Sequence, residues 1–392
     1  GPLGTMVGLY ETAIEILASV KRKGMNVIPK YVASTATIRH ADSQVQALFN
    51  RRLAQFPPPG VCIDDSFFAI SREPHPLENT PAGRLYVGVC APGRGAQTPI
   101  TRIWSAILHE METIRRLRGA SDTEADQFWS LVGYFNSKRE LAGALGLLRA
   151  DIPERLRVLA TRTGRQCREP LQYIELSGRT ESFEIPGKLD RLSKFPENDV
   201  DAVFATSMFG TGVDVDRLGL MVVHGQPKTT ANYIQATGRV GRKTGGLVIT
   251  FLRATRPRDL DHYEFFVGYH RALHRHVEAI TVYPFSPRAR ERGLGPLGVL
   301  LLRNARQVWG TPVPADWAPE EVARRGTVAR SGSRVMARMR RSIEVRAIID
   351  AIESRAMAQP RGRNPGTGVS RQEISSEPVS YTHLRAHETV LD

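Results

Sequence analysis

Cysteine is scarce in this chain of 392 residues: only Cys62, Cys90 and Cys167 occur, far apart and in no C-x-x-C pattern. Such spacing excludes a disulfide framework and a cysteine-ligated zinc site. It also suits a reducing compartment, so we expect the protein to be cytoplasmic.

Long apolar runs are also missing. The longest, residues 297–302, is interrupted by Gly298 and is far too short to span a bilayer. No signal peptide is visible, although a truncated start would hide one. We therefore predict no membrane partner.

The charge of the chain is strongly positive. The formal net charge is +14, and hydrophobic residues make up 41% of the chain, which is enough for a buried core. A basic surface favours nucleic acid as a partner, because cations that neutralise phosphates release counterions. It can also serve solubility alone, so charge leaves both interpretations open.

The most informative motif is the segment 233–242, YIQATGRVGR. It places Gln235 and Arg239 four residues apart, and Arg242 three further on. On a helix these positions share one face, which predicts that the three side chains converge. Two adjacent guanidiniums suit a phosphate anion, as in arginine fingers. The alternative is a solvated turn at a helix end, with Gly241 as a left-handed cap.

A second segment lies upstream, at residues 203–214, VFATSMFGTGVD. It reads as a short apolar strand, a loop of small residues and an aspartate. In α/β proteins a buried strand that delivers such a loop to a sheet edge presents backbone amides to ligands. This context favours the phosphate interpretation of the arginine motif.

Together the two segments resemble motifs V and VI of superfamily 2 helicases, the nucleic-acid-dependent ATPases built from two RecA-like domains. Residues 34–38 (STATI) resemble their Ser-Ala-Thr coupling motif, residues 132–138 (VGYFNSK) resemble motif IV, and residues 176–180 (LSGRT) resemble the next strand-end loop. The resemblance implies an α/β fold: a RecA-like parallel sheet with crossover helices, plus an insert and a helical C-terminal region.

The resemblance also implies roles for individual residues. Arg239 and Arg242 would act on the γ-phosphoryl group of ATP, and Gln235 on phosphate or the attacking water. For Asn136 and Thr180 an equal alternative is a structural role as loop caps. The remaining expected sites are ATP-binding Gly212 and Asp214, the coupling residues Ser34, Thr35, Ala36 and Thr37, and the DNA-backbone contacts Asn136, Ser137, Lys138, Arg179, Thr180 and Thr206.

Two elements that a complete ATPase of this class needs are absent from the sequence. It holds no G-x-x-x-x-G-K-[ST] phosphate loop and no Asp-Glu dipeptide for an acidic box. We therefore expect ATP and Mg²⁺ to be shared with a first RecA-like domain that the chain lacks. The chain alone is expected to be inactive, and no metal site of its own is predicted.

A closer resemblance, to the helicase of DISARM-type anti-phage systems, covers roughly residues 1–300. It implies a DNA helicase or translocase in phage defence, with a second defence-system subunit among its partners. Residues 209–211 (FGT) depart from the family pattern and leave the loop contacts there open. Residues 1–4 (GPLG) also fit a cleavage scar from a tag. The resemblance rests on residues 1–11, 56–60, 65–68, 217–223, 225–230, 256–259 and 284–287.

Hydrophobic patterning predicts the order of elements. We expect helices at 10–21 and 101–118, strands at 26–38, 130–135, 171–176, 200–205, 219–224 and 246–252, and helical patterns from 255 to 358. The predicted domains are a remnant of the first RecA-like domain (1–38), a connector or insert (39–125), the second RecA-like domain (126–255), a basic helical accessory region (256–358) and a disordered tail (359–392) whose last 15 or so residues are non-native.

Two further clusters have competing explanations. For the histidines near Glu264, a packed aromatic-histidine helix is favoured over a zinc site, because no cysteine lies nearby. For the arginine stripe, a solvated face and a nucleic-acid-facing helix remain equal alternatives. The histidines are His262, His270, His274 and His276, and the arginines are Arg334, Arg338 and Arg341.

Three function classes remain open at this stage. The first is the motor half of an ATP-dependent DNA helicase in phage defence. The second is a nucleic-acid remodelling helicase outside defence. The third is a passive nucleic-acid-binding module that never meets a nucleotide.

Overall fold

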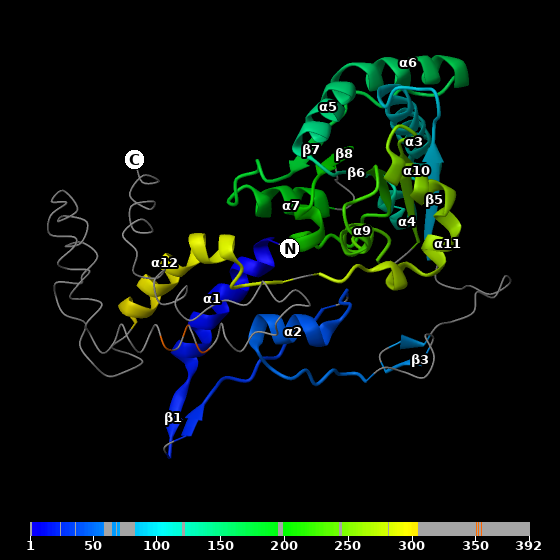
Figure 1. Ribbon diagram of the computed structural model, residues 1–392. Coiled ribbons are helices and arrows are strands. Elements are labelled where there is room, and N and C mark those ends of the chain that lie inside the picture. Colours follow the sequence, from blue (N-terminus) through cyan, green and yellow to red (C-terminus); the bar gives the residue numbers. More distant parts are fainter. Residues whose placement is uncertain are drawn as a thin grey trace. The chain divides into compact units, whose positions relative to one another are not determined.

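In the computed structural model the chain forms two compact units (Figure 1). One comprises Ser71–Glu278, and the other comprises Gly1–Ile70 together with Ala279–Asp392. The described residues are 2–58 apart from 24 and 36, 65–67, 69–70, 83–119, 122–194, 199–242, 245–280, 282–304, and 350, 352 and 354.

The larger unit is built on a six-stranded sheet in which every neighbouring pair of strands is parallel. The strand order is β5-β10-β9-β6-β8-β7. This arrangement confirms the predicted α/β fold, a RecA-like parallel sheet with crossover helices. The strands are β5 (Arg84–Cys90), β6 (Leu131–Phe135), β7 (Tyr173–Leu176), β8 (Ala202–Ala205), β9 (Leu220–His224) and β10 (Gly246–Leu252).

Five of these strands lie where the apolar runs predict them, but β5 does not. Its residues fall within the connector predicted for 39–125, whereas Arg84–Cys90 is an edge strand paired with β10 along its whole length. The compact unit accordingly starts at Ser71 rather than at 126, and it extends to Glu278 rather than to 255. Glycine and proline on both sides of β5 hid a strand that is only half-buried.

Helices cover both faces of the sheet (Figure 1). Because side chains alternate along a strand, Leu131 and Phe135 face one apolar cluster while Val132 and Tyr134 face the other. Helices α3, α5 and α6 pack into the first cluster, and α7, α8, α9 and α11 into the second. The helices of this unit are α3 (Gln97–Arg118), α4 (Thr123–Gln127), α5 (Lys138–Arg149), α6 (Asp151–Thr163), α7 (Ile185–Ser193), α8 (Met208–Gly212), α9 (Thr230–Thr237), α10 (Pro257–Glu264), α11 (Phe266–Arg271) and the 3₁₀ turn η1 (Leu273–His276).

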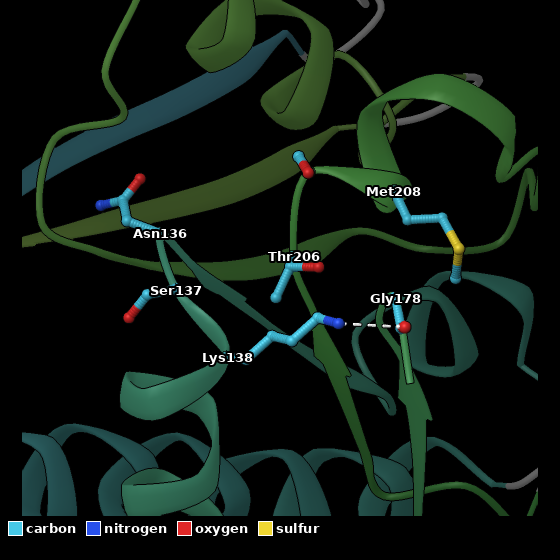
Figure 2. Close-up of a pocket in the computed structure, with 7 residues that line it drawn as sticks. Asn136, Ser137, Lys138, Gly178, Thr206 and Met208 are labelled. Carbon is cyan, nitrogen blue, oxygen red and sulfur yellow. Dashed lines mark hydrogen bonds between the residues drawn. The ribbon is translucent and has the colours of Figure 1, made fainter. Parts of the chain in front are cut away.

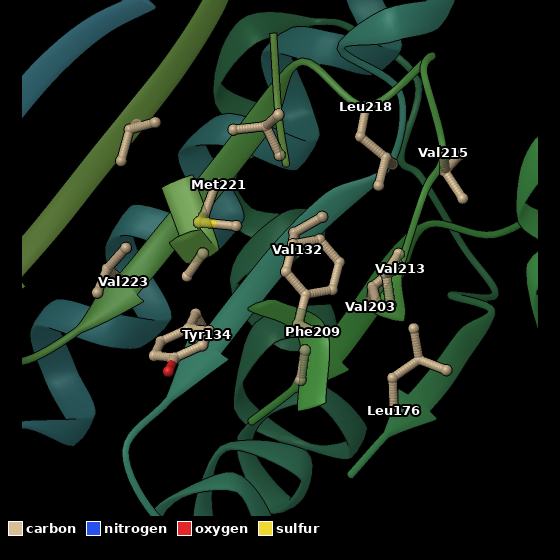
Figure 3. Close-up of a cluster of buried hydrophobic side chains, with 14 of the residues drawn as sticks. Val132, Tyr134, Leu176, Val203, Phe209, Val213, Val215, Leu218, Met221 and Val223 are labelled. Carbon is tan, nitrogen blue, oxygen red and sulfur yellow. The ribbon is translucent and has the colours of Figure 1, made fainter. Parts of the chain in front are cut away.

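The second cluster holds the functional loops in place. Phe209 of α8 is fully buried against side chains from the central strands, among them Val132 and Met221 (Figure 3). Tyr233 and Ala236 of α9 are buried in the same cluster. Burial on this scale stabilises each large side chain by about 1.5–3 kcal/mol, so α8 and α9 are firmly attached to the sheet.

The smaller unit is helical, with two short antiparallel hairpins. Its apolar core joins Leu9 and Ala13 of α1 to Phe285 and to Leu294 and Leu297 of α12. Its elements are α1 (Pro2–Ala18), α2 (Ala41–Phe49), α12 (Pro287–Arg303), the hairpin of β1 (Val20–Arg22) with β2 (Met25–Val27), and the hairpin of β3 (Asp65–Ser66) with β4 (Ala69–Ile70).

The strand expected at 26–38 is wrong beyond Val27: β2 ends there, and the described residues of 28–38 form no strand. The run contains Pro29 and a Ser/Thr cluster, which favour irregular backbone. The arginine stripe at 334–341 and the tail at 359–392 lie outside the described residues.

Candidate nucleotide and nucleic-acid sites

The arginine motif occupies a turn after α9 rather than the helix itself. The helix ends at Thr237, so the predicted sharing of one helical face by Gln235, Arg239 and Arg242 is wrong. Beyond the helix the chain makes two tighter turns, with the amide of Arg239 bonded to the Ala236 carbonyl and that of Val240 to the Thr237 carbonyl. The two arginines are therefore placed by this turn and its tertiary contacts.

Gly241 reverses the chain between the arginines and β10. Its φ of +61° lies in the left-handed region, as in the alternative drawn from the sequence, although the cap of α9 itself is Gly238. A Cβ at Gly241 would lie 2.8 Å from the Cα of Gly246, so no side chain fits there. The Gly241 amide donates to the Leu218 carbonyl at 2.7 Å, which ties the turn to the start of β9.

Both arginines contact the segment that follows β8. The Nη2 of Arg239 donates to the Gly210 carbonyl at 2.9 Å, and Arg242 forms an ion pair with Asp214. Asp216 adds a second carboxylate at 4.0 Å from the Arg242 Nη1. Arg242 remains 37% exposed, so an incoming anion can reach its guanidinium. The turn and the segment after β8 thus meet through charge-assisted contacts.

Gln235 and Gly212 lie on the two elements that frame this meeting point. Gln235 is an exposed residue near the end of α9, and a Cβ at Gly210 would touch its side chain at 3.6 Å. Gly212 is the last residue of α8. The structure therefore brings the expected catalytic and ATP-binding residues to one place, although by a route other than helical spacing.

A groove of about 480 Å³ opens at the carboxyl ends of β6, β7 and β8 (Figure 2). The carboxyl ends of parallel strands are where α/β proteins bind ligands. Four of the six residues expected to contact DNA line it, together with three that sequence reasoning did not name. Its lining residues are Asn136, Ser137, Lys138, Gly178, Thr206, Ser207 and Met208.

Lys138 is the cation of this groove. It is exposed at the start of α5, and its Nζ donates to the Gly178 carbonyl at 3.0 Å (Figure 2). An ammonium group has three donors, so two remain for an anionic ligand. Ser137 is the N-cap of α5 and accepts from the Glu140 amide at 3.2 Å, which fixes the start of the helix.

Asn136 and Thr180 both act as loop caps, the alternative role that the sequence left open. The Asn136 amide nitrogen donates to the carbonyls of His224, Gly225 and Gln226 at 3.1, 3.1 and 3.3 Å. The Thr180 hydroxyl donates to the Glu175 carbonyl at 2.9 Å and accepts from the Ser177 amide. Arg179 is exposed beside Gly178 but does not line the groove.

The coupling motif belongs to the smaller unit. Its backbone is irregular, and the Thr37 amide donates to the Thr35 hydroxyl at 3.3 Å in an exposed turn. Ser34 is exposed, and Ala36 is outside the described residues. Its coupling role stays a prediction.

Sequence reasoning missed a basic cluster at the end of β10. The Nη2 of Arg256 lies 2.5 Å from the Glu140 Oε1, and the Nη1 of Arg253 lies 3.4 Å from the same oxygen. Burial and the neighbouring Arg256 lower the pKa of Arg253. Asp259 accepts from the amides of Gln226 and Arg253 and so joins this cluster to β9. The signal available was the RPRD sequence, which begins at Arg256, four residues after the end of a predicted strand.

The histidine cluster packs against aromatic rings, spread over α10, α11 and η1 rather than on one helix. The ring of His270 lies 4.0 Å from that of Phe266, and its Nε2 lies 2.9 Å from the Tyr233 hydroxyl. Burial lowers the pKa of His270, which favours its neutral form. Within the described residues, no group of metal-binding side chains is assembled, and no helix is long and apolar enough to cross a membrane.

Comparison with known proteins gives a consistent set of matches. Residues 154–244 match the helicase conserved C-terminal domain family. The chain is 46% identical over 309 residues to the DISARM protein DrmA of Bacillus paralicheniformis, covering 77% of this chain and 27% of that protein. It is 31% identical over 74 residues to DEAD-box ATP-dependent RNA helicase 56 of Oryza sativa, covering 19% of this chain and 17% of that protein.

Among solved structures, the chain is similar to that of the DUF1998 helicase MrfA bound to DNA. The match has a TM-score of 0.47 and 17% identity, and it covers 77% of this chain and 34% of that one. A superposition this loose locates no individual residue. The chain spans about a quarter of the length of the DrmA protein, 27%.

Proposed function

We propose that this chain, which matches the helicase conserved C-terminal domain over residues 154–244 and is similar to the DISARM protein DrmA, is the C-terminal motor half of an ATP-dependent DNA helicase or translocase of superfamily 2. One observation supports this most. The segment after β8 contributes Thr206 to the strand-end groove and, a few residues later, Gly210 and Asp214 to the arginine turn. A single short segment thus connects the two proposed sites.

Arg239 and Arg242 fit a role as arginine fingers. Their guanidiniums are held by a carbonyl oxygen and by carboxylates, acceptors of the kind that phosphate oxygens would replace. Positive charge at the transferring phosphoryl group is worth about 10³–10⁵ in rate in comparable enzymes. ATP and Mg²⁺ would supply that phosphoryl group and its metal. The phosphate loop and acidic box would come from a first RecA-like domain.

The groove at the ends of β6, β7 and β8 fits a sugar-phosphate backbone. Lys138 provides charge, while Ser137 and Thr206 provide hydroxyls and Gly178 leaves the backbone accessible. Contacts of this kind position a strand without reading its bases. Arg179, adjacent to the groove, would extend the contacts along the strand.

The similarity to DrmA supports a place in a DISARM-like phage-defence system, with a second defence-system subunit as partner. A general remodelling helicase would share the arginine turn and the groove but not the extended similarity. A passive nucleic-acid-binding module would need the groove alone. The experiment below separates this last class from the first.

The test uses two variants that should fail in opposite ways, in a protein in which this chain is joined to its first RecA-like domain. Arg242→Ala is expected to abolish DNA-stimulated ATP hydrolysis and leave strand affinity intact. Lys138→Ala is expected to weaken binding of single-stranded DNA and to reduce the slope of log affinity against log salt by about 0.7, the share of one phosphate contact. Both are measured by ATP turnover and by strand titration at several salt concentrations.

Arg191→Ala is the matched control. Arg191 also has a 39% exposed side chain paired with a carboxylate, that of Asp199, at 2.5 Å, but it lies on α7 and does not line the groove. It should keep turnover and affinity. Unchanged turnover in Arg242→Ala would overturn the arginine-finger assignment. Strand binding without any DNA-stimulated ATP hydrolysis in the unsubstituted protein would leave the passive module as the better explanation.

A further inference from the structure

The turn that carries Arg239 and Arg242 is rich in glycine and needs external support. Glycines stand at 238, 241, 245 and 246, and glycine is the residue with the most backbone freedom to lose. Catalytic groups must nevertheless be held to within a fraction of an ångström, since a displacement of about 1 Å can cost about 10²-fold in rate. Some part of the fold must therefore restrain the turn.

Arg84 supplies that restraint, although it lies about 150 residues before the turn in the sequence. Its Nε donates to the Val240 carbonyl at 2.6 Å, and its Nη2 donates to the Gly238 carbonyl at 3.2 Å. These two carbonyls flank Arg239. One guanidinium therefore bridges the turn on both sides of the residue that contacts Gly210.

The strand that carries Arg84 is well suited to this purpose. Arg84 and Tyr86 are two residues apart on β5, so they lie on the same face of the sheet. The Tyr86 hydroxyl lies 3.3 Å from the Thr237 hydroxyl at the end of α9. The start of β5 is also bonded to the turn's far end, where the Gly246 amide donates to the Gly83 carbonyl at 3.3 Å. Four hydrogen bonds, made at Gly83, Arg84 and Tyr86, thus join the edge strand to the turn and its flanks.

We propose that Arg84 is a positioning residue that holds the arginine turn in its working geometry. The inference rests on the proposed function of Arg239 and Arg242. A planar fork with donors on adjacent nitrogens bridges two carbonyls, which a lysine ammonium cannot do with the same geometry. Arg84 touches neither substrate nor nucleotide in this scheme, and its effect passes through the backbone of residues 238–240.

The first measurement is steady-state ATP turnover with saturating DNA, in the same protein used for Arg242→Ala. Arg84→Ala is expected to lower kcat by about 10- to 100-fold while the KM for ATP, strand affinity and melting temperature stay unchanged. Arg84→Lys should recover part of the lost kcat. Arg94→Ala, an exposed arginine in the turn after the same strand, is the control and should behave as wild type.

The second measurement is amide hydrogen exchange, which does not depend on activity. In Arg84→Ala the amides of Arg239 and Gly241, both hydrogen-bonded in the turn, should lose protection, while those of β9 and β10 keep theirs. Unchanged exchange at the amides of Arg239 and Gly241 would overturn the positioning role of Arg84. A wild-type kcat in Arg84→Ala with an inactive Arg242→Ala would reject this inference and leave the proposed function standing, whereas an active Arg242→Ala would reject the proposed function.

A loss of melting temperature, strand affinity and kcat together in Arg84→Ala would also overturn the proposal. That pattern would mean that Arg84 only stabilises the sheet edge. The positioning role predicts instead that kcat falls alone and that the arginine turn exchanges faster.

Discussion

At the scale of single residues, His224 at the end of β9 is buried in its neutral form. Its Nε2 accepts from the Trp104 indole at 3.1 Å, and its ring stacks on Phe135 at 4.3 Å. Burial, and then the nearby Arg253, lower its pKa from 6.5 to about 3. Protonation would place a charge in the core and break the indole bond.

This burial predicts a pH dependence of stability. Below pH 6.5 the unfolded chain takes up a proton at His224, while the folded chain does not until the pH reaches about 3. The contribution of neutral, buried His224 to the free energy of unfolding should therefore be fully present above pH 6.5. Below that pH the free energy of unfolding should fall by up to about 1.4 kcal/mol for each pH unit. Urea unfolding at a series of pH values measures the slope. His224→Gln keeps an acceptor for the indole, and it should reduce the slope of the free energy of unfolding against pH by the share of one proton. An equal slope in both proteins would contradict the burial of a neutral His224.

At the scale of elements, the packing of α3 on the sheet depends on a glycine. A Cβ on Gly133 of β6 would lie 2.5 Å from the Trp104 ring and 2.9 Å from that of Phe135. Gly133→Ala should therefore destabilise the protein by about 1–3 kcal/mol through overpacking. Gly143, exposed on α5 with open space around it, is the matched control. Gly143→Ala should be neutral or stabilise by up to about 1 kcal/mol, because alanine favours helix. Chemical denaturation compares the two variants.

The burial of each strand decided whether the sequence could predict it. Strands such as β6 and β9 are buried on both faces, so their continuous runs of apolar residues predict them. Strand β5 is half-exposed at the sheet edge and lacks that signal. Arg242 and Asp214 were both expected at an ATP site, but their ion pair was not predicted, and the helical face expected for Gln235, Arg239 and Arg242 is wrong because α9 ends at Thr237. The path of the chain beyond α9 depends on long-range contacts of Gly241 with Leu218 and Gly246, which no local pattern contains.

At the scale of the whole molecule, the apolar cores divide with the two units. Both clusters that sandwich the sheet are formed within residues 71–278, while Leu9, Phe285 and Leu297 share a core in the other unit. Separate cores are the mark of parts able to fold alone.

A protein comprising residues 71–278 should therefore unfold in one cooperative transition, measured by circular dichroism in urea. It should also retain the strand-end groove, with affinity for single-stranded DNA that falls steeply with salt. Lys138→Ala in this shorter protein should weaken that affinity as in the longer one. A non-cooperative transition would show that the sheet needs the other unit, and a salt-independent affinity would show that phosphates are not what the groove binds.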